Sequence, residues 1–228
     1  MDRLRTLLFW IVFCTLSVPM VLAVPVAGLF GRRTLRRYAD AWAGMMCVAS
    51  QWILGIHIRI EGAIPNGPVF FAAKHESLFE AIQLTRMLNS PSTVLKRELA
   101  DIPVWGWAAK RYGGIVVDRT ANAAALRSMM ADAKAAKAEG RSVLIFPEGT
   151  RVPHGESPEL RAGFAGLYRI LGLPVVAIAV KSAHVWPRKG AKHPGEVVFR
   201  FGEPIEPGLP RDQIEARVHA EINALNQS

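Results

Sequence analysis

The stretch "VFFAAKHESLFE", Val69 to Glu80, joins a short apolar run to a polar segment that starts a helix. The apolar run predicts a buried strand. Ser77 followed three residues later by Glu80 is a Ser-x-x-Glu capping box, which marks the first turn of a helix. A strand leading directly into a helix is the repeating unit of an α/β fold. On this local pattern alone, Glu80 caps the backbone and His75 is an ordinary loop residue.

The same pattern recurs along the chain from about residue 57, where short apolar runs alternate with helical segments. An Ala-rich segment ends at Gly140, and four apolar residues near the C-terminus keep helical spacing. We therefore expect an α/β fold over residues 57–228, with a central mostly parallel or mixed sheet flanked by helices. The predicted strands are 57–62, 69–73, 92–95, 114–117, 142–146, 175–180 and 196–202.

Polar and charged residues cluster directly after these strands. In open α/β sheets, ligands bind at the carboxyl ends of parallel strands. If several of these strands are parallel, one edge of the sheet holds a histidine, a carboxylate and several cations, which favours a functional role for His75. The residues concerned are Lys74, His75, Lys96, Arg97, Asp118, Arg119, 147–151, Lys181, Ser182 and His184.

The spacing of His75 and Glu80 allows them to meet only if His75 precedes the helix. On one continuous helix, residues five apart point about 140° from each other. A Glu80 carboxylate folded back toward the loop can hold one imidazole nitrogen and support the imidazolium that forms when the other nitrogen takes a proton. No serine or cysteine motif resembles a nucleophile, so the simplest chemistry is general-base activation of a substrate hydroxyl.

The segment "FPEGTR", residues 146–151, follows another predicted strand and supplies the opposite charge. Gly149 lets backbone N–H groups approach a phosphate, Thr150 offers a hydroxyl, and Arg151 can bind two phosphate oxygens. Arg119 offers a second guanidinium. The alternative is a strand-to-turn corner that carries a surface arginine.

Composition narrows the class of partner. The chain has 228 residues, 50% of them hydrophobic, and a net charge of +9. An apolar and basic protein fits an anionic surface, such as a membrane leaflet or a phosphorylated substrate. Nucleic acid is disfavoured, because the chain has no long Lys/Arg run, zinc-finger spacing or aromatic RNA-binding signature. Cys14 and Cys47 lie in apolar segments and form no metal-binding pattern, so we expect no bound metal.

The first 56 residues predict a membrane anchor of two helices. Residues 6–30 carry no charge and are long enough to cross a bilayer, and a second apolar segment covers 41–56. Because basic residues flank both ends of the first segment, a hairpin that enters and leaves one leaflet suits the charges better than a single crossing. A cleavable signal peptide and a pair of buried core helices are the alternatives. The flanking basic residues are Arg3, Arg5, Arg32, Arg33, Arg36 and Arg37.

Four blocks in order carry a family resemblance. They are "HESLFE", "KRELADIPVWGWAAKRYGGIVVDR" (Lys96 to Arg119), "FPEGTR" and "LPVVAIAV" (Leu173 to Val180). Together they resemble the membrane-bound 1-acylglycerol-3-phosphate acyltransferases of the glycerolipid acyltransferase family. The chain departs from the family pattern at Glu80, where aspartate is usual, and at Ala177, where a second proline is common.

The resemblance implies transfer of a fatty acyl group from acyl-CoA or acyl-carrier protein to the free hydroxyl of lysophosphatidate, without a bound cofactor. It also implies a cytoplasmic-face location on the inner membrane, His75 as base and Glu80 as its orienting group. Three alternatives stay open: another lysolipid such as lyso-ornithine lipid as acceptor, thioester hydrolysis, or a non-catalytic membrane lipid-binding protein. The residues implied for the acceptor phosphate are Arg119, Glu148, Gly149, Thr150 and Arg151, helped by Lys96.

Overall fold

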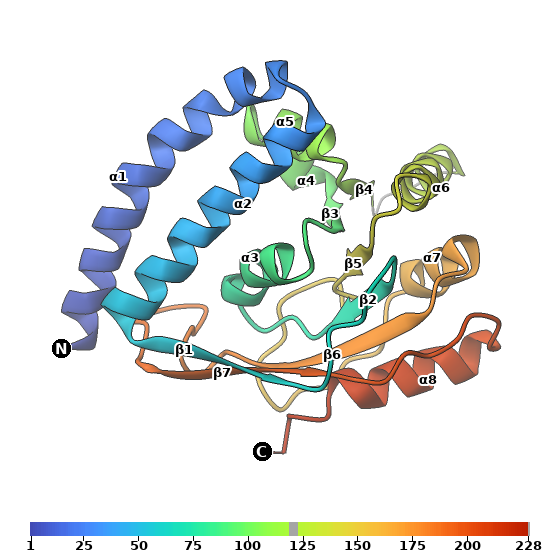
Figure 1. Ribbon diagram of the computed structural model, residues 1–228. Coiled ribbons are helices and arrows are strands. Elements are labelled where there is room, and N and C mark those ends of the chain that lie inside the picture. Colours follow the sequence, from blue (N-terminus) through green and yellow to red (C-terminus); the bar gives the residue numbers. More distant parts are fainter. Residues whose placement is uncertain (119–122, 228) are drawn as a thin grey trace.

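Seven strands form one sheet, in the order β1-β7-β6-β2-β5-β3-β4 (Figure 1). The computed structural model describes residues 1–118 and 123–227. The strands are β1 (Ile56–Glu61), β2 (Phe70–Ala73), β3 (Ser92–Lys96), β4 (Ile115–Val117), β5 (Val143–Ile145), β6 (Val175–Lys181) and β7 (Gly195–Phe201). The helices are α1 (Asp2–Leu29), α2 (Arg32–Ala49), the π-helix η1 (Ser50–Leu54), α3 (Leu78–Met87), α4 (Arg97–Ala100), α5 (Trp105–Tyr112), α6 (Ala123–Ala138), α7 (Gly163–Leu171) and α8 (Arg211–Ile222).

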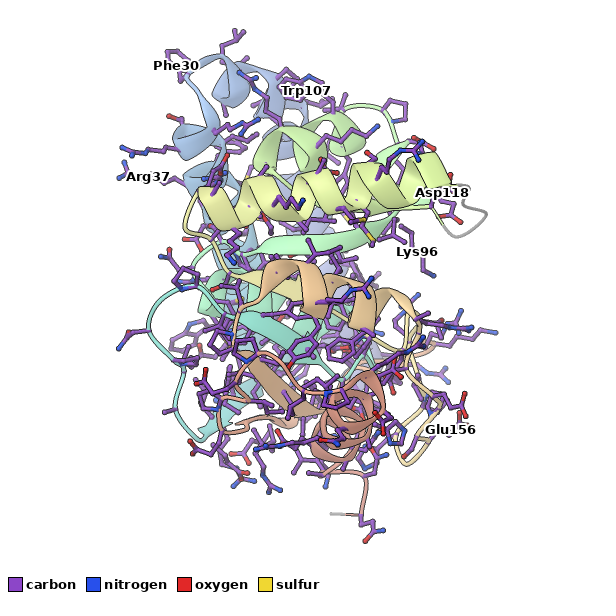
Figure 2. All side chains as sticks on the ribbon, turned by 90° about the vertical axis from the view of Figure 1, so that its right-hand side faces the viewer. Phe30, Arg37, Lys96, Trp107, Asp118 and Glu156 are labelled. Atoms are coloured by element: carbon purple, nitrogen blue, oxygen red, sulfur yellow. The ribbon has the colours of Figure 1, made fainter. Side chains whose placement is uncertain are left out.

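The sheet is mixed, with five parallel strands at its centre and one side. β6, β2, β5, β3 and β4 run in the same direction, whereas β7 is antiparallel to β6 and parallel to β1. The carboxyl ends of the five parallel strands therefore meet at one edge, as the sequence predicted. Figure 2 shows Lys96, Asp118 and Glu156 along the same side of the molecule.

Two hydrophobic cores lie on opposite faces of the sheet, because successive strand residues point to opposite faces. Phe71 and Ala73 of β2 face the core beneath α1, α2 and α3, and Phe70 and Ala72 face the core beneath α6, α7 and α8 (Figure 1). All four are at most 2% exposed, and full burial of one phenylalanine contributes about 1.5–3 kcal/mol. β2, which leads to His75, is thus fixed from both faces.

The C-terminal helix confirms the predicted spacing. Ile214, Val218, Ile222 and Leu225 are each at most 3% exposed. The first three pack into the core beneath α6 and α7, and Leu225 packs with residues of β6 and β7. These contacts bring the C-terminal end of α8 against the sheet near the ends of the parallel strands.

The N-terminal helices form an antiparallel pair that turns at Gly31, whose φ of +95° favours glycine. Within the described residues, α1 is the helix long and apolar enough to cross a membrane. Its inner side is buried, with Phe9 at 0% and Phe13 at 9% exposure, in the same core as Trp186 of the α/β part. Its outer side exposes an apolar stripe. The stripe consists of Leu4, Leu7, Leu8, Ile11, Val18, Leu22, Val26 and Leu29.

The second helix begins earlier than the apolar segment at 41–56 indicated. α2 starts at Arg32 and ends at Ala49, and a π-helical turn leads from it to β1. The reason is that α2 is amphipathic. Leu35, near its start, is as buried as Met46, so the buried side of the helix already begins among the arginines. A search for continuous apolar residues misses such a start. The predicted division into 1–56 and 57–228 stays a prediction about organisation.

Candidate active site

His75 lies in the loop between β2 and α3, at the centre of the carboxyl edge. Its Nδ1 is 2.9 Å from Oε1 of Glu80, and its ring stacks on Phe146 with centroids 4.2 Å apart. The His75 side chain remains 19% exposed. The contact expected from a folded-back Glu80 is therefore present, and it leaves the other ring nitrogen, Nε2, as the one a substrate would approach.

Glu80 is fully buried and accepts hydrogen bonds on both oxygens. Oε1 accepts from the Ser77 N–H at 2.5 Å as well as facing His75. Oε2 accepts from the hydroxyls of Ser77 and Ser182, the latter at 2.9 Å. The capping box and the contact with the imidazole are thus made by one carboxylate. A carboxylate oxygen accepts hydrogen bonds, so in this contact His75 donates from Nδ1.

A second buried glutamate holds the same loop through its main chain. Glu148 is 2% exposed. Its Oε2 accepts the backbone N–H of His75 at 3.1 Å, and its Oε1 accepts from the Lys74 ammonium at 2.7 Å. The structure therefore places Glu148 beneath the site with both oxygens bonded inside the protein. The sequence marked Glu148 as a phosphate ligand and placed Lys74 only among the cations of this edge, without a partner.

Glu76 fixes the loop that follows β6. Its Oε2 accepts the backbone N–H groups of Ser182 at 2.7 Å and Ala183 at 2.9 Å. Its Oε1 lies 2.7 Å from Nδ1 of His154. Ser182 in turn donates toward Glu80, so three segments meet behind His75. Sequence analysis noted Ser182 after its strand but missed Glu76, whose partners are 78 to 107 positions away along the chain.

The Gly149–Arg151 segment runs beside His75. The N–H of Val152 donates to the His75 carbonyl at 2.7 Å, and Gly149 has a φ of +70°, which favours glycine at this turn. Thr150 and Arg151 are exposed. Burial, and after it the positive charge of Arg151, lower the pKa of the Lys192 ammonium. Positive charge gathered beside His75 favours an anionic ligand.

The neighbouring strands contribute further residues. Lys96 is half-buried at the end of β3, the strand beside β5. Arg97 pairs with Asp118 at 2.8 Å across the ends of β3 and β4. Arg119 lies outside the described residues. Within residues 1–118 and 123–227, no group of three or more His, Cys, Asp or Glu side chains is placed to hold a metal ion.

Comparison with known proteins assigns the family. A family model described as Acyltransferase matches residues 55–181, more than half of the chain. The chain belongs to the Acyltransferase family. It is 31% identical over 227 residues to the 1-acyl-sn-glycerol-3-phosphate acyltransferase of Pseudomonas aeruginosa, covering 97% of this chain and 87% of that protein. It is 26% identical over 215 residues to the enzyme of the same name from Saccharomyces cerevisiae, covering 87% and 71%.

A solved structure supports the fold. The chain matches the crystal structure of the 1-acyl-sn-glycerophosphate (LPA) acyltransferase PlsC from Thermotoga maritima with a TM-score of 0.78. The match covers 100% of this chain and 97% of that one at 20% identity. This acyltransferase therefore has an α/β fold with an N-terminal helix pair, as the sequence predicted. The individual roles of its site residues stay predictions.

Proposed function

We propose that this acyltransferase moves a fatty acyl group from a thioester to the free hydroxyl of 1-acylglycerol-3-phosphate, which yields phosphatidate. The observation that carries the proposal is the His75–Glu80 pair beside the exposed Arg151 segment, on adjacent parallel strands. A base and an anion-binding segment a short distance apart suit an acceptor that carries a hydroxyl and a phosphate. The names of the relatives from Pseudomonas aeruginosa and Saccharomyces cerevisiae support the same acceptor.

The proton moves through His75. As the acceptor oxygen attacks the thioester carbon, Nε2 takes the hydroxyl proton and the Glu80 carboxylate stabilises the imidazolium. The C–S bond then breaks, and the leaving sulfur takes the proton back from Nε2. A thioester is already activated, so this route requires no covalent enzyme intermediate. Alignment of the two reactants by the protein supplies much of the rate.

The phosphate of the acceptor is held by Arg151, Thr150 and the turn at Gly149. Arg151 offers two N–H groups in a planar fork, which fits two phosphate oxygens. Lys192, whose pKa the charge of Arg151 lowers, adds to the positive potential of this site. Glu148 supports this site without binding the phosphate itself, because its oxygens hold Lys74 and the His75 main chain. We extend the phosphate site to Lys96, the last residue of β3, and to Arg119 on its place in the sequence alone.

The acyl donor is acyl-CoA or acyl-carrier protein, since both present a fatty acyl thioester. Neither is a bound cofactor, because the donor is consumed in each turnover. Supplying each thioester separately at equal acyl-chain length distinguishes the two, with thiol release as the readout.

The enzyme acts on a membrane leaflet that it touches through the outer side of α1. The leaflet contact extends from that apolar stripe to α5, where Trp107 is 45% exposed and its ring lies against Gly28 of α1. Figure 2 shows Trp107 and Phe30 at the same end of the molecule. Tryptophan is enriched at membrane interfaces. Because α1 and α2 are antiparallel, both termini of the hairpin face one side of the membrane, which we assign to the cytoplasm.

Reporter fusions and vesicle flotation test this membrane contact. We expect reporters at either end of the chain to indicate the cytoplasmic side. An Ile11→Asp change on the outer stripe should release the protein from phospholipid vesicles, whereas Arg211→Ala on α8 should not. Reporters on opposite sides would refute the hairpin in favour of one full crossing.

One assay separates the candidate reactions. Thiol release from an acyl thioester is measured with purified enzyme alone, with lysophosphatidate, and with a phosphate-free lysolipid such as lyso-ornithine lipid. We expect release to depend on lysophosphatidate and to match phosphatidate formed. Equal release without acceptor indicates a thioesterase, preference for the phosphate-free lysolipid indicates a different acceptor, and no release indicates a binding protein.

A further inference from the structure

Lys74 precedes His75 and has no part in the proton transfer, yet its side chain is fully buried. Its ammonium donates to Glu148 Oε1 at 2.7 Å, to the Glu156 carbonyl at 2.6 Å and to Asn223 Oδ1 at 2.7 Å. An ammonium has three N–H groups, so every donor is used. The three acceptors come from three segments: the turn after β5, the loop before α7 and the end of α8.

Burial of this ammonium is costly unless its partners are in place. Removing one member of a buried ion pair is strongly destabilising, because the other charge is left uncompensated. The position of Lys74 is therefore tightly coupled to that of Glu148. Glu148 in turn fixes the position of the His75 main chain, since its Oε2 accepts the N–H of His75 at 3.1 Å.

The other end of the network lies on the C-terminal helix. Asn223 donates from Nδ2 to the His219 carbonyl at 2.7 Å, which turns its oxygen toward Lys74. Asn226 donates to the Glu156 carbonyl at 3.1 Å and to Ser157 Oγ at 2.9 Å. Residues 151–157 are thus held at one end by the end of α8 and at the other by the His75 carbonyl, through Val152. Figure 2 shows Glu156 on the edge where the parallel strands end.

We propose that Lys74 and Asn223 are positioning residues, through which the end of α8 sets the distance between His75 and Arg151. Lys74 acts on the His75 main chain by way of Glu148, and on the segment after Arg151 by way of Glu156. An error of about 1 Å between a base and a substrate-binding group can cost on the order of 10²-fold in rate. The activity readout rests on the proposed function, whereas the spectroscopic readout below does not.

The direct test follows the His75 amide. The chain has six histidines, so selective ¹⁵N-histidine labelling in detergent micelles gives a small amide spectrum. A His75→Gln change assigns the His75 signal by its disappearance. We expect Asn223→Ala to move that signal, although Asn223 has no direct contact with His75. The matched control is Tyr168→Phe, which removes a polar group that likewise bonds inside the protein, a hydroxyl that contacts the loop before α8.

Enzyme activity provides a second test of the positioning role. We expect Asn223→Ala to lower kcat about tenfold or more with little change in KM, because binding groups remain but their alignment with the base is lost. Asn223→Asp keeps an oxygen for Lys74 and should recover most of kcat. Effects of Asn223→Ala and Glu148→Gln should be non-additive, as for residues in one network, whereas Tyr168→Phe and Glu148→Gln should add.

Each result decides a separate point. A His75 amide unmoved by Asn223→Ala, or moved equally by Tyr168→Phe, would overturn the positioning role. Additive losses for Asn223→Ala and Glu148→Gln would overturn it as well. If the amide moves as expected but the wild type fails to acylate lysophosphatidate, the network stands and the proposed acceptor is wrong. If Asn223→Ala does not fold, Asn223→Ser serves the amide test, because its shorter side chain keeps a polar group but withdraws the oxygen from Lys74.

Discussion

Two buried glutamates hold His75, and they hold different parts of it. Glu80 contacts the imidazole, with Ser77 and Ser182 as its other partners. Glu148 contacts the His75 main chain and is paired with Lys74. A carboxylate on the ring can change the basicity of Nε2, whereas one on the backbone sets where the ring stands. Burial alone therefore does not reveal which of two glutamates takes part in the chemistry.

The largest loss of activity is expected for changes at His75 itself. Changes at Glu80 or Glu148 should lower the rate by less. His75→Ala should lower phosphatidate formation by at least ~10²–10⁴-fold, the usual contribution of a positioned acid–base group. The measurement is the initial rate of purified protein whose fold is checked by circular dichroism. His57→Ala, at an exposed position of β1, is the control. Wild-type rates from folded His75→Ala protein would exclude the mechanism.

Removal of the Glu80 charge comes next. Glu80→Gln should cut kcat by more than tenfold, because the imidazolium loses the charge that supports it. Glu80→Asp keeps the charge and should be milder. Turnover and thermal stability are measured together on the same preparations. If Glu80→Gln loses stability but keeps turnover, Glu80 is only a helix cap, worth about 1 kcal/mol.

Arg151 extends the comparison to the acceptor side of the site. Each hydrogen bond to a charged group is worth about 1.5–3 kcal/mol, so Arg151→Ala should weaken use of lysophosphatidate at least tenfold. Lysine should rescue only in part, because it lacks the planar fork. Thioester hydrolysis without acceptor should change much less, and Arg211→Ala should change neither. Full activity of Arg151→Ala on lysophosphatidate would remove Arg151 from the phosphate site.

The smallest effect is expected for a third, more exposed glutamate, which joins the N-terminal hairpin to the α/β part. Glu139 pairs with Arg32 at 2.6 Å and with Arg36, and its side chain is 31% exposed. The hydrogen bond from Arg36 is the main cause that lowers the pKa of Glu139. Glu139→Gln should cost no more than about 1 kcal/mol of stability, as is typical of such pairs.

The pH dependence of this cost follows from its sign. A carboxyl whose pKa is lower in the folded state stabilises above the unfolded pKa, and the contribution disappears as pH falls through the folded value. The difference in melting temperature between wild type and Glu139→Gln should therefore be largest near neutral pH and vanish in acid. A difference that persists unchanged in acid would show that the charge of Glu139 is not its cause.

Local patterns predicted most of the fold and one side of the site. The seven strands coincide with predicted short segments, most of them apolar runs and one, β1, an alternation of isoleucine with polar residues. The capping box located the start of α3 and the turn of Glu80 toward His75. The start of α2 was missed, because its inward stripe begins among exposed arginines. Such a stripe becomes visible only when helical periodicity is weighed above continuous hydrophobicity.

The supporting network could not be predicted in the same way. Lys74 and Asn223 are 149 positions apart, and Lys74 and Glu148 are 74 apart. A lysine after a strand has the same local pattern whether it faces solvent or a buried carboxylate. Only the order of the strands and the return of α8 bring these groups together, and both are tertiary properties.

The central claim is that Glu80 acts on the chemistry of the His75 ring, whereas the Lys74 network only positions the His75 main chain. The dependence of kcat/KM on pH tests this claim most directly. It is measured on lysophosphatidate for wild type, Glu80→Gln and the uncharged change Asn223→Ala. We expect Glu80→Gln to move the acid limb of the curve to lower pH, because the imidazolium is less stabilised and the base is neutral sooner. Asn223→Ala should lower the whole curve without moving it. An unmoved acid limb in Glu80→Gln, or an equal shift in both variants, would contradict the assignment of Glu80 to the chemistry and of the Lys74 network to position.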